Sequence, residues 1–198
     1  MAQIMRYILN MVPFMLGSLP FVFVFRALRI NKMKKLNIKT TVLHEIGVII
    51  FVLFLIALAS QTIIPKMQFT NGRLEIIGAM QGKINLLPFK VLVDTYKEIF
   101  VYGNIRNFII YFIGNIVMFI PIGFFIPLLW NKISFKKIML IAFSVPLFIE
   151  ICQLPQARIV DIDDVWLNAL GVLSGYFLFL IISKLKPKFS IKFKISFL

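Results

Sequence analysis

Residues 150–176 contain most of the polar side chains that could bind a ligand or do chemistry, and apolar runs flank them on both sides. An ionisable side chain at membrane depth is costly, so it is normally either paired or used for function. Five residues of this stretch follow one another at spacings of 3, 4, 3 and 4: Asp161, Asp164, Asn168, Gly171 and Gly175. At about 100° per residue they share one helix face. This pattern predicts a polar site above a close helix contact.

Asp163 lies about 100° from Asp164 around the same helix. We expect it to face the headgroup region, where a charge stays solvated at little cost. Its expected role is limited to capping the helix, because carboxylates suit a helix N-terminus. Replacing Asp163 should therefore matter much less than replacing Asp164 or Asn168.

Two further helices bring polar side chains to a depth similar to that of Asn168. Glu150 lies 13 residues beyond Lys137, or about 20 Å along a helix, in the outer half of a ~30 Å hydrocarbon core. Asn115 has a comparable depth, and Gln153 shares a face with Glu150. We expect Arg158 and Glu150 to interact, directly or through an aspartate, because they flank a short connection.

This cluster has a structural and a functional interpretation. In the structural one, Arg158 neutralises the carboxylates while Asn115 and Asn168 hydrogen-bond between helices. In the functional one, the cluster lines a cavity open to the outer leaflet or the outside and receives a polar head group. We favour the functional interpretation, because a purely structural bundle would not need several charges at membrane depth.

The sequence gives no support to several other kinds of site. Cys152 and His44 are the only residues of their types, so neither a disulfide nor a zinc site is expected. The sequence contains no HExxH, no G-x-S-x-G and no phosphate-cradling loop, so we expect no catalytic residue and no cofactor. Carboxylates and amides could hold Mg²⁺ or Ca²⁺, but Arg158 argues for internal pairing, and no metal is expected.

The composition predicts an all-α integral membrane helical bundle. The 198 residues are 60% hydrophobic with a mean hydropathy of +0.93, more apolar surface than a soluble domain of this length can bury. About five transmembrane helices, each near the ~20 residues needed to cross, are predicted at 7–28, 44–64, 107–130, 138–154 and 165–183. Pro146 predicts a kinked or partly buried fourth helix.

The distribution of Lys and Arg predicts the orientation. The segments 26–39, 132–137 and 184–194 carry 14 of the 22 basic residues, which places them in the cytoplasm with the N-terminus outside and the C-terminus inside. A net charge of +14 would indicate nucleic acid in a soluble protein, but here it indicates topology and anionic lipid. The tail at 184–198 either lies on the inner leaflet or is disordered.

The outside loop, residues 65–106, is the largest segment expected outside the membrane. Within it, NLLPF at 85–89 leads into a segment whose apolar residues have helical spacing: Phe89, Leu92, Val93, Tyr96, Ile99 and Phe100. Its polar side carries Lys90, Asp94, Lys97 and Glu98. This segment is predicted to be a short helix that either lies in the outer interface or plugs the bundle from above.

The order of these motifs resembles the VanZ-like family of small bacterial membrane proteins. The matching pieces are NLLPF at 85–89, GNIVMFIPIGFFIP at 114–127, E-x-x-Q at 150–153, Arg158, DIDD at 161–164 and N-x-x-G-x-x-x-G at 168–175. The resemblance covers residues 44–183 as a core. It leaves residues 1–43 as an extra N-terminal transmembrane helix with a basic cytoplasmic loop, and 184–198 as a basic cytoplasmic tail.

The resemblance implies a multi-pass protein of the cell membrane that is associated with resistance to lipid-tailed glycopeptides such as teicoplanin. Carried over by position, its binding residues are Asn85, Asn115, Glu150, Gln153, Arg158, Asp161, Asp164 and Asn168. We expect a non-catalytic protein whose outer-leaflet pocket engages a lipid head group, a lipid-linked envelope precursor or a lipoglycopeptide antibiotic. The alternatives are an intramembrane enzyme that modifies a lipid-linked precursor, and a transporter of lipids or small molecules.

The orientation gives a direct test. Alkaline phosphatase, which is active only outside the cytoplasm, should be highly active when fused within residues 65–106 and inactive when fused within 29–41. Green fluorescent protein fused at the same positions should give the opposite pattern. High phosphatase activity at 29–41 with none at 65–106 would refute the orientation.

Overall fold

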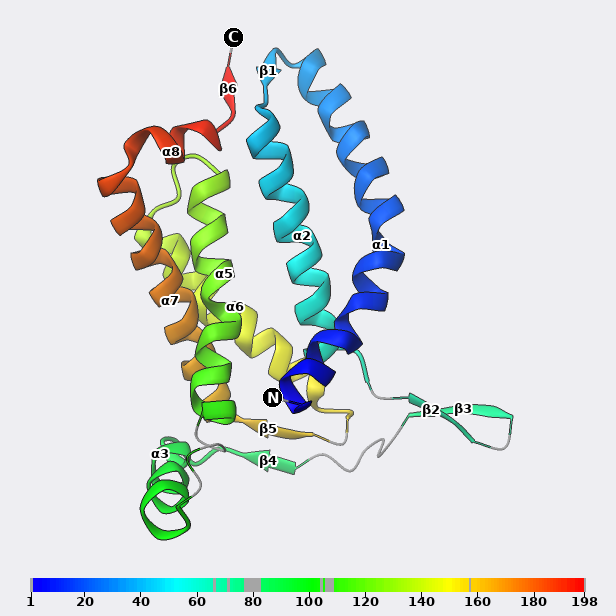
Figure 1. The fold of residues 1–198 in the computed structure, drawn as a ribbon, viewed down its shortest axis with the longest axis vertical. Helices are drawn as coiled ribbons and strands as arrows, with labels where there is room; N and C mark the ends of the chain where they lie inside the picture. Colours follow the sequence, from blue (N-terminus) through cyan, green and yellow to red (C-terminus); the bar gives the residue numbers. More distant parts are fainter. Residues whose placement is uncertain are drawn as a thin grey trace. The chain divides into compact units, whose positions relative to one another are not determined.

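The computed structural model describes residues 2–65, 67–70, 72–76, 83–103, 105, 109–156 and 158–197. These residues form a mainly helical fold, drawn in Figure 1. The chain divides into two compact units. The first unit comprises residues 1–61, 124–134 and 176–198, and the second comprises residues 62–123 and 135–175.

Four helices in the described residues are long and apolar enough to cross a membrane, which agrees with the predicted all-α membrane bundle. They are Leu9–Lys35, Val42–Thr62, Tyr111–Leu129 and Ile162–Leu185. The predicted span at 138–154 also forms a helix, α6 (Phe135–Gln153). It is not among the four, because it carries three charged residues: Lys136, Lys137 and Glu150. The start of the predicted 107–130 span lies outside the described residues.

In the first unit, α1 (Ala2–Lys35) and α2 (Val42–Thr62) run side by side (Figure 1). Both Nε and Nη2 of Arg26 donate to Oε2 of Glu45, at 2.9 and 2.6 Å. The two side chains are only 17% and 15% exposed, and a charge-assisted bond shielded from water is stronger than a neutral one. This ion pair fixes the N-terminal helix to α2.

The tail is ordered, so its interpretation as a disordered segment is wrong. It forms α8 (Pro187–Lys192) and β6 (Ser196–Phe197), and β6 pairs antiparallel with β1 (Ile38–Lys39). Thr41 Oγ1 donates to the Lys192 carbonyl at 2.5 Å, and Nδ1 of the buried His44 lies 2.8 Å from the Phe193 carbonyl oxygen. The tail is thus bound to the start of α2.

Lys194 extends this attachment to the end of α5 (Gly114–Leu129). Its Nζ donates to the carbonyls of Pro127 and Trp130, the latter at 2.7 Å. The last carbonyls of a helix have no partner within it, so a lysine from the tail satisfies them. Burial lowers the pKa of Lys194 from its ordinary value.

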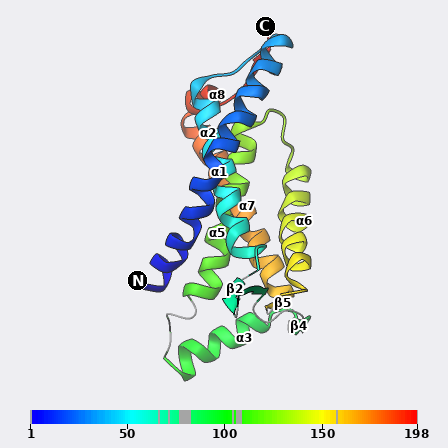
Figure 2. The same ribbon diagram turned by 90° about the vertical axis from the view of Figure 1, so that its right-hand side faces the viewer.

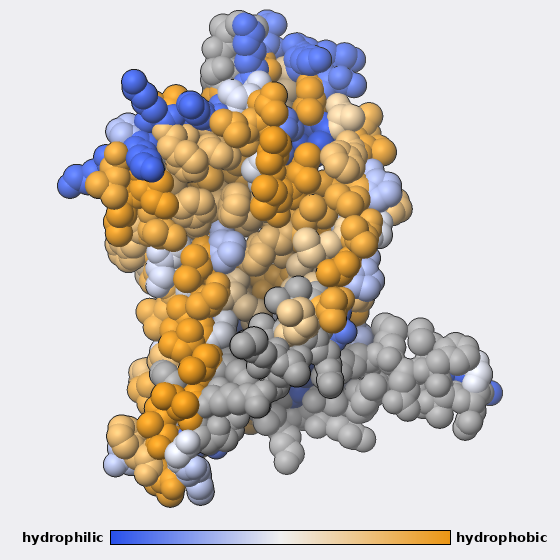
Figure 3. All heavy atoms as spheres, viewed as in Figure 1, coloured by the Kyte–Doolittle hydropathy of each residue, from blue (hydrophilic) through white to orange (hydrophobic). Residues whose placement is uncertain are grey.

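Figure 3 shows hydrophilic residues gathered over α8 and over the end of α1 near β1, with hydrophobic residues along the helices of this unit. On α1 the exposed residues include Phe21 and Phe25, at 68% and 69% of their surface. Large exposed apolar side chains on a long helix are suited to contact with lipid.

In the second unit, α6 and parts of α5 and α7 (Ile162–Leu185) pack around fully buried residues such as Phe119, Ile138 and Leu167. α5 and α7 approach each other closely at Gly171. A Cβ at this position would lie 2.2 Å from the Ile116 carbonyl oxygen and 2.9 Å from Cβ of Phe119. The predicted close helix contact is therefore confirmed at Gly171, and Gly175 is also buried.

The segment predicted as an outside loop contains short elements that the sequence did not indicate. β2 (Met67–Thr70) and β3 (Arg73–Ile76) form a hairpin, and β4 (Lys83–Asn85) pairs in parallel with β5 (Ile159–Asp161). The predicted helix at 89–100 is confirmed as α3 (Lys90–Tyr96), which continues into η1 (Lys97–Val101), while η2 (Ile109–Ile113) precedes α5. Figure 2 shows α3, β4 and β5 at the same end of α7.

The close approach at Gly171 predicts the effect of a single methyl group. Gly171→Ala should lower the stability of the protein in detergent by about 1–3 kcal/mol, because the added Cβ overlaps backbone that cannot move freely. Gly17→Ala is the matched control, since nothing lies within 4 Å of a Cβ at that position of α1. Thermal melting followed by size-exclusion chromatography measures both. Equal melting temperatures for the two variants would contradict the close contact.

Candidate functional site

Asp161 connects three of the predicted site residues. As the residue before α7, it caps that helix: its Oδ1 accepts from the Asp163 N–H at 2.9 Å, as expected of an N-cap aspartate. The β4–β5 pairing aligns it with Asn85, whose Nδ2 donates to Asp161 Oδ2 at 2.9 Å. Its own backbone N–H donates to Oε2 of Glu150 at 3.1 Å. The cap of α7, the strand pair and α6 therefore meet at one residue, Asp161.

Asp164 and Asn115 join α7 to α5. Nδ2 of Asn115 donates to Oδ1 of Asp164 at 2.6 Å, a contact between helices as polar residues in membranes make them. Among the described residues, Oδ1 is the oxygen of Asp164 for which a hydrogen bond is found. One turn further along α7, Asn168 is 5% exposed, and its Oδ1 has no hydrogen-bond partner within the described part of the chain.

Gln153 and Arg158 both reach the end of α2. Nε2 of Gln153 and Nη1 of Arg158 donate to the Thr62 carbonyl at 3.0 and 3.1 Å. Gln156, which the sequence did not single out, donates to the Ile63 carbonyl at 2.7 Å. These residues satisfy carbonyls that a helix end leaves without partners. The expected interaction between Glu150 and Arg158 stays a prediction.

Asp163 corrects the sequence analysis. It is 1% exposed, and its carboxylate accepts three bonds: from the backbone N–H groups of Phe89 and Val91, both at 2.6 Å, and from Trp166 Nε1 at 2.7 Å. The angular position assigned to it is right, but the side of α7 that it occupies faces the start of α3 instead of solvent. The expectation that Asp163 is solvated is therefore wrong, and these contacts argue against the expectation that replacing it has little effect.

The hydrogen bond that Asp163 accepts from the Phe89 N–H also explains an unusual backbone conformation at Phe89. Phe89 precedes α3 with a φ of 62°, in the left-handed region that bulky residues rarely adopt. Its N–H is held by Asp163, and its ring lies 5.8 Å from the Trp166 ring, centroid to centroid. The spacing of Asp163 and Trp166, a carboxylate with an indole about one helical turn away, is the sequence signal that could have pointed to Asp163.

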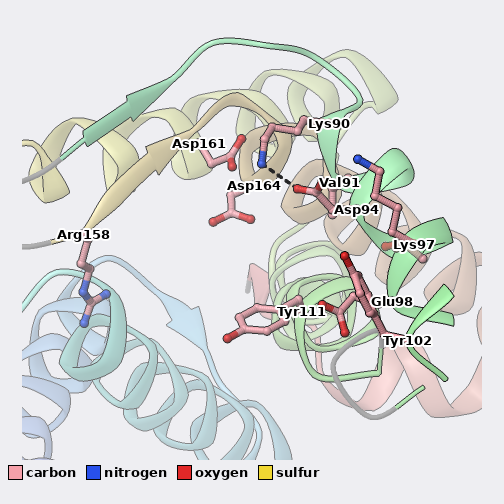
Figure 4. Close-up of a pocket in the computed structure, with 11 residues that line it drawn as sticks. Lys90, Val91, Asp94, Lys97, Glu98, Tyr102, Tyr111, Arg158, Asp161 and Asp164 are labelled. Atoms are coloured by element: carbon pink, nitrogen blue, oxygen red, sulfur yellow. Dashed lines mark hydrogen bonds and ion pairs between the residues drawn. The ribbon is translucent and has the colours of Figure 1, made fainter. Parts of the chain in front are cut away.

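A cavity of about 640 Å³ lies in the second unit, next to these residues. Figure 4 shows its walls: α3 and η1 on one side, Tyr111 below, and the segment from Arg158 to Asp164 on the other side. The lining residues are Lys90, Val91, Asp94, Thr95, Lys97, Glu98, Tyr102, Tyr111, Arg158, Asp161 and Asp164. Three of the eight predicted site residues therefore line the cavity: Arg158, Asp161 and Asp164.

The other five predicted residues lie behind the cavity wall. Asn85 and Glu150 bond to Asp161, and Asn115 bonds to Asp164. Gln153 bonds to the end of α2, and Asn168 lies one turn along α7 from Asp164. The contacts of Asn85, Glu150 and Asn115 orient Asp161 and Asp164, which line the cavity. Tyr102 and Tyr111 are lining residues that the sequence analysis missed, because an aromatic residue near a span end is also typical of an ordinary interface anchor.

The chemistry of the wall is mixed. It carries the cations Lys90, Lys97 and Arg158, four carboxylates, and the hydroxyls of Thr95 and two tyrosines. Lys90 pairs with Asp94 at 2.6 Å, and the hydrogen bond and charge of Asp94 raise the pKa of Lys90. Within the described residues, no group of three or more His, Cys, Asp or Glu side chains could hold a metal ion. The arrangement is suited to a polar group with both anionic and donor parts.

The buried position of Asp163 predicts that its isosteric variant is destabilising. Asp163→Asn should cost about 1.5–3 kcal/mol, the usual range for hydrogen bonds to a charged group, because an amide presents an N–H₂ to donors. Hydrogen exchange of residues 85–101 should accelerate. Asp94→Asn is the control: it removes an exposed ion pair, which typically contributes at most about 1 kcal/mol. Unchanged exchange in Asp163→Asn would show that this carboxylate does not hold α3.

A comparison with protein families places most of this chain in a known group. The model of the VanZ/LLP1 family matches residues 46–183, which include all eight predicted site residues and the whole cavity wall. No curated protein and no solved structure matches the chain.

Proposed function

This chain belongs to the VanZ/LLP1 family of proteins, and from this membership and the cavity of the second unit we propose that it binds the polar head group of a membrane lipid, a lipid-linked envelope precursor or a lipid-tailed antibiotic. Binding of this kind would confer resistance to lipoglycopeptides such as teicoplanin. The protein would act in the cell membrane, as a binding protein and not as an enzyme.

The observation that carries this proposal is the position of Asp164 on the cavity wall and the hydrogen bond that it accepts. Its carboxylate lines the cavity, and the hydrogen bond found for it among the described residues uses Oδ1 alone. Asp164 is partly buried and borders the cavity, and a carboxylate near membrane depth is costly unless it is paired or used for function. A ligand with hydroxyl or amine donors would complete this site.

The size and charges of the cavity fit the same ligand class. About 640 Å³ falls within the range of roughly 300–1,000 Å³ that is usual for small-molecule sites. Lys97 and Arg158 supply cationic donors of the kind that phosphate groups accept. A head group that combines a phosphate with sugar hydroxyls or an amine would use both sides of the wall.

The orientation predicted from the basic residues supports a position at the outer leaflet. Every lining residue except Tyr111 falls within 90–102 or 158–164, and the positive-inside rule assigns both segments to the outside. Tyr111 lies near the outer end of the predicted span at 107–130. Lipoglycopeptides and the precursors that they bind are met on that side of the membrane.

A second candidate follows from the same carboxylates. Asp161 and Asp164 share one cavity with Tyr111 and Arg158, and paired carboxylates can act as general acid and base. The alternative is therefore an intramembrane enzyme that modifies a lipid-linked envelope precursor. Lipid analysis of cells with and without the protein separates the two functions, because only an enzyme leaves a new covalent species.

Removing the charge of Asp164 tests the binding function. Asp164→Asn keeps an oxygen for Asn115 but removes the negative charge, so binding should weaken about tenfold, the equivalent of ~1.4 kcal/mol. Lys97→Gln should also weaken binding. The measurement is teicoplanin resistance normalised to membrane abundance, together with binding to purified protein in detergent.

The control is Lys136→Gln, which neutralises an exposed lysine at the start of α6. It should leave resistance unchanged. Full resistance in Asp164→Asn at normal abundance would count decisively against the head-group pocket.

A further inference from the structure

The segment 89–102, which comprises α3, η1 and their flanking residues, has two chemically different faces. One face, together with Tyr102 at the end of the segment, contributes seven residues to the cavity wall: Lys90, Val91, Asp94, Thr95, Lys97, Glu98 and Tyr102. The other carries large apolar side chains that are 45–71% exposed: Phe89, Leu92, Val93, Tyr96 and Phe100. Figure 3 shows hydrophobic residues over this segment. An exposed apolar face of this kind marks a surface with a partner.

One contact and one sequence distance indicate the level of this segment along the candidate spans. Asp163, in the first turn of α7, binds the backbone of Phe89 and Val91 at 2.6 Å. At its other end, Tyr102 precedes by nine residues the start of the span Tyr111–Leu129. Both neighbours are ends of helices that are long and apolar enough to cross a membrane. The segment therefore lies where two spans enter the bilayer.

The amino-acid composition of the segment 89–102 is typical of the interface between membrane and water. Tyr96 and Tyr102 are 61% and 69% exposed, and tyrosines are enriched at the interface between hydrocarbon and water. The segment carries two lysines and two carboxylates, so its own charges balance. Its affinity for a bilayer would come from apolar area, with little dependence on anionic lipid.

We infer that the segment 89–102 is a membrane-docking element, whose apolar face inserts into the outer interface of the bilayer while its polar face forms the wall of the cavity. The ligand then reaches the cavity sideways from the leaflet, as a membrane-anchored amphiphile, and not as a soluble molecule. This inference rests on the proposed head-group function for the identity of the ligand, but the docking itself does not depend on it.

The experiment uses the full chain in phosphatidylcholine vesicles, with its single cysteine removed as Cys152→Ser. Nitroxide labels are attached to single cysteines at Leu92 and Phe100 on the apolar face, and at Lys97 on the polar face. Collisions with oxygen, which concentrates in lipid, are compared with collisions with a water-soluble nickel chelate. A face inserted about 5–10 Å into the headgroup and acyl boundary should show a several-fold higher ratio of oxygen to nickel than position 97.

Two results would overturn the inference. Nickel accessibility at 92 and 100 equal to that at 97 would mean that the face lies in water. Protection of 92 and 100 from both reagents would mean that another protein surface, such as a second copy of the chain, covers it. Adding phosphatidylglycerol to the vesicles should leave the ratios unchanged, and a strong increase in insertion would contradict the role of apolar area.

A matched pair of variants separates this inference from the proposed function. Leu92→Gln combined with Phe100→Gln should reduce the insertion of a label at Val93, whereas Asp164→Asn should leave it unchanged. Insertion together with full resistance in Asp164→Asn would refute the head-group function alone. Nitroxide labels on the apolar face that remain accessible to the nickel chelate, together with loss of resistance in Asp164→Asn, would refute the docking alone.

Discussion

The organisation of the second unit depends on one buried carboxylate. Asp163 accepts two backbone N–H groups from the start of α3 and the indole N–H of Trp166. A buried charge is tolerated only where hydrogen bonds replace the lost water, and three donors do so here. The requirement works in both directions. The carboxylate needs donors, and the first N–H groups of α3 need acceptors, so α3 is fixed to α7 and one wall of the cavity is positioned.

A similar requirement governs the helix ends elsewhere in the chain. The final carbonyls of α2 receive donors from Gln153, Gln156 and Arg158, and those at the end of α5 receive the ammonium group of Lys194. Backbone groups near a bilayer cannot rely on water for their hydrogen bonds. Long polar side chains from distant parts of the sequence supply these hydrogen bonds instead of water. Gln153 was predicted to bind a ligand, but its observed contact is with the last carbonyl of α2.

The sequence predicted the features that depend on helical periodicity. The part of the stripe from Asp164 to Gly175 follows from residue spacing, and the Asn115–Asp164 bond and the close approach at Gly171 agree with it. Asp161 was expected on the same helix face, but it ends β5 and caps α7 instead. The partner of Asp163 could not be predicted in this way. It lies 74 residues away and consists of backbone N–H groups, which every residue except proline has, so they leave no mark on the sequence. The same holds for the pairing of β4 with β5, which aligns Asn85 with Asp161.

The hydrogen-bond inventory of α7 also limits what the cavity can bind. Asp163 and Asp161 have donors for both of their oxygens. Asp164 has one for Oδ1, and Oδ1 of the buried Asn168 has none within the described residues. An unsatisfied buried acceptor such as Oδ1 of Asn168 costs about 1–3 kcal/mol, but Asn168 does not line the cavity, whereas the partly buried Asp164 does. A fully ionised phosphate offers only acceptors, which suit Lys97 and Arg158 better than Asp164. In the head-group function proposed above, hydroxyls or an amine of the ligand would donate to Asp164 while its phosphate faces Lys97 and Arg158.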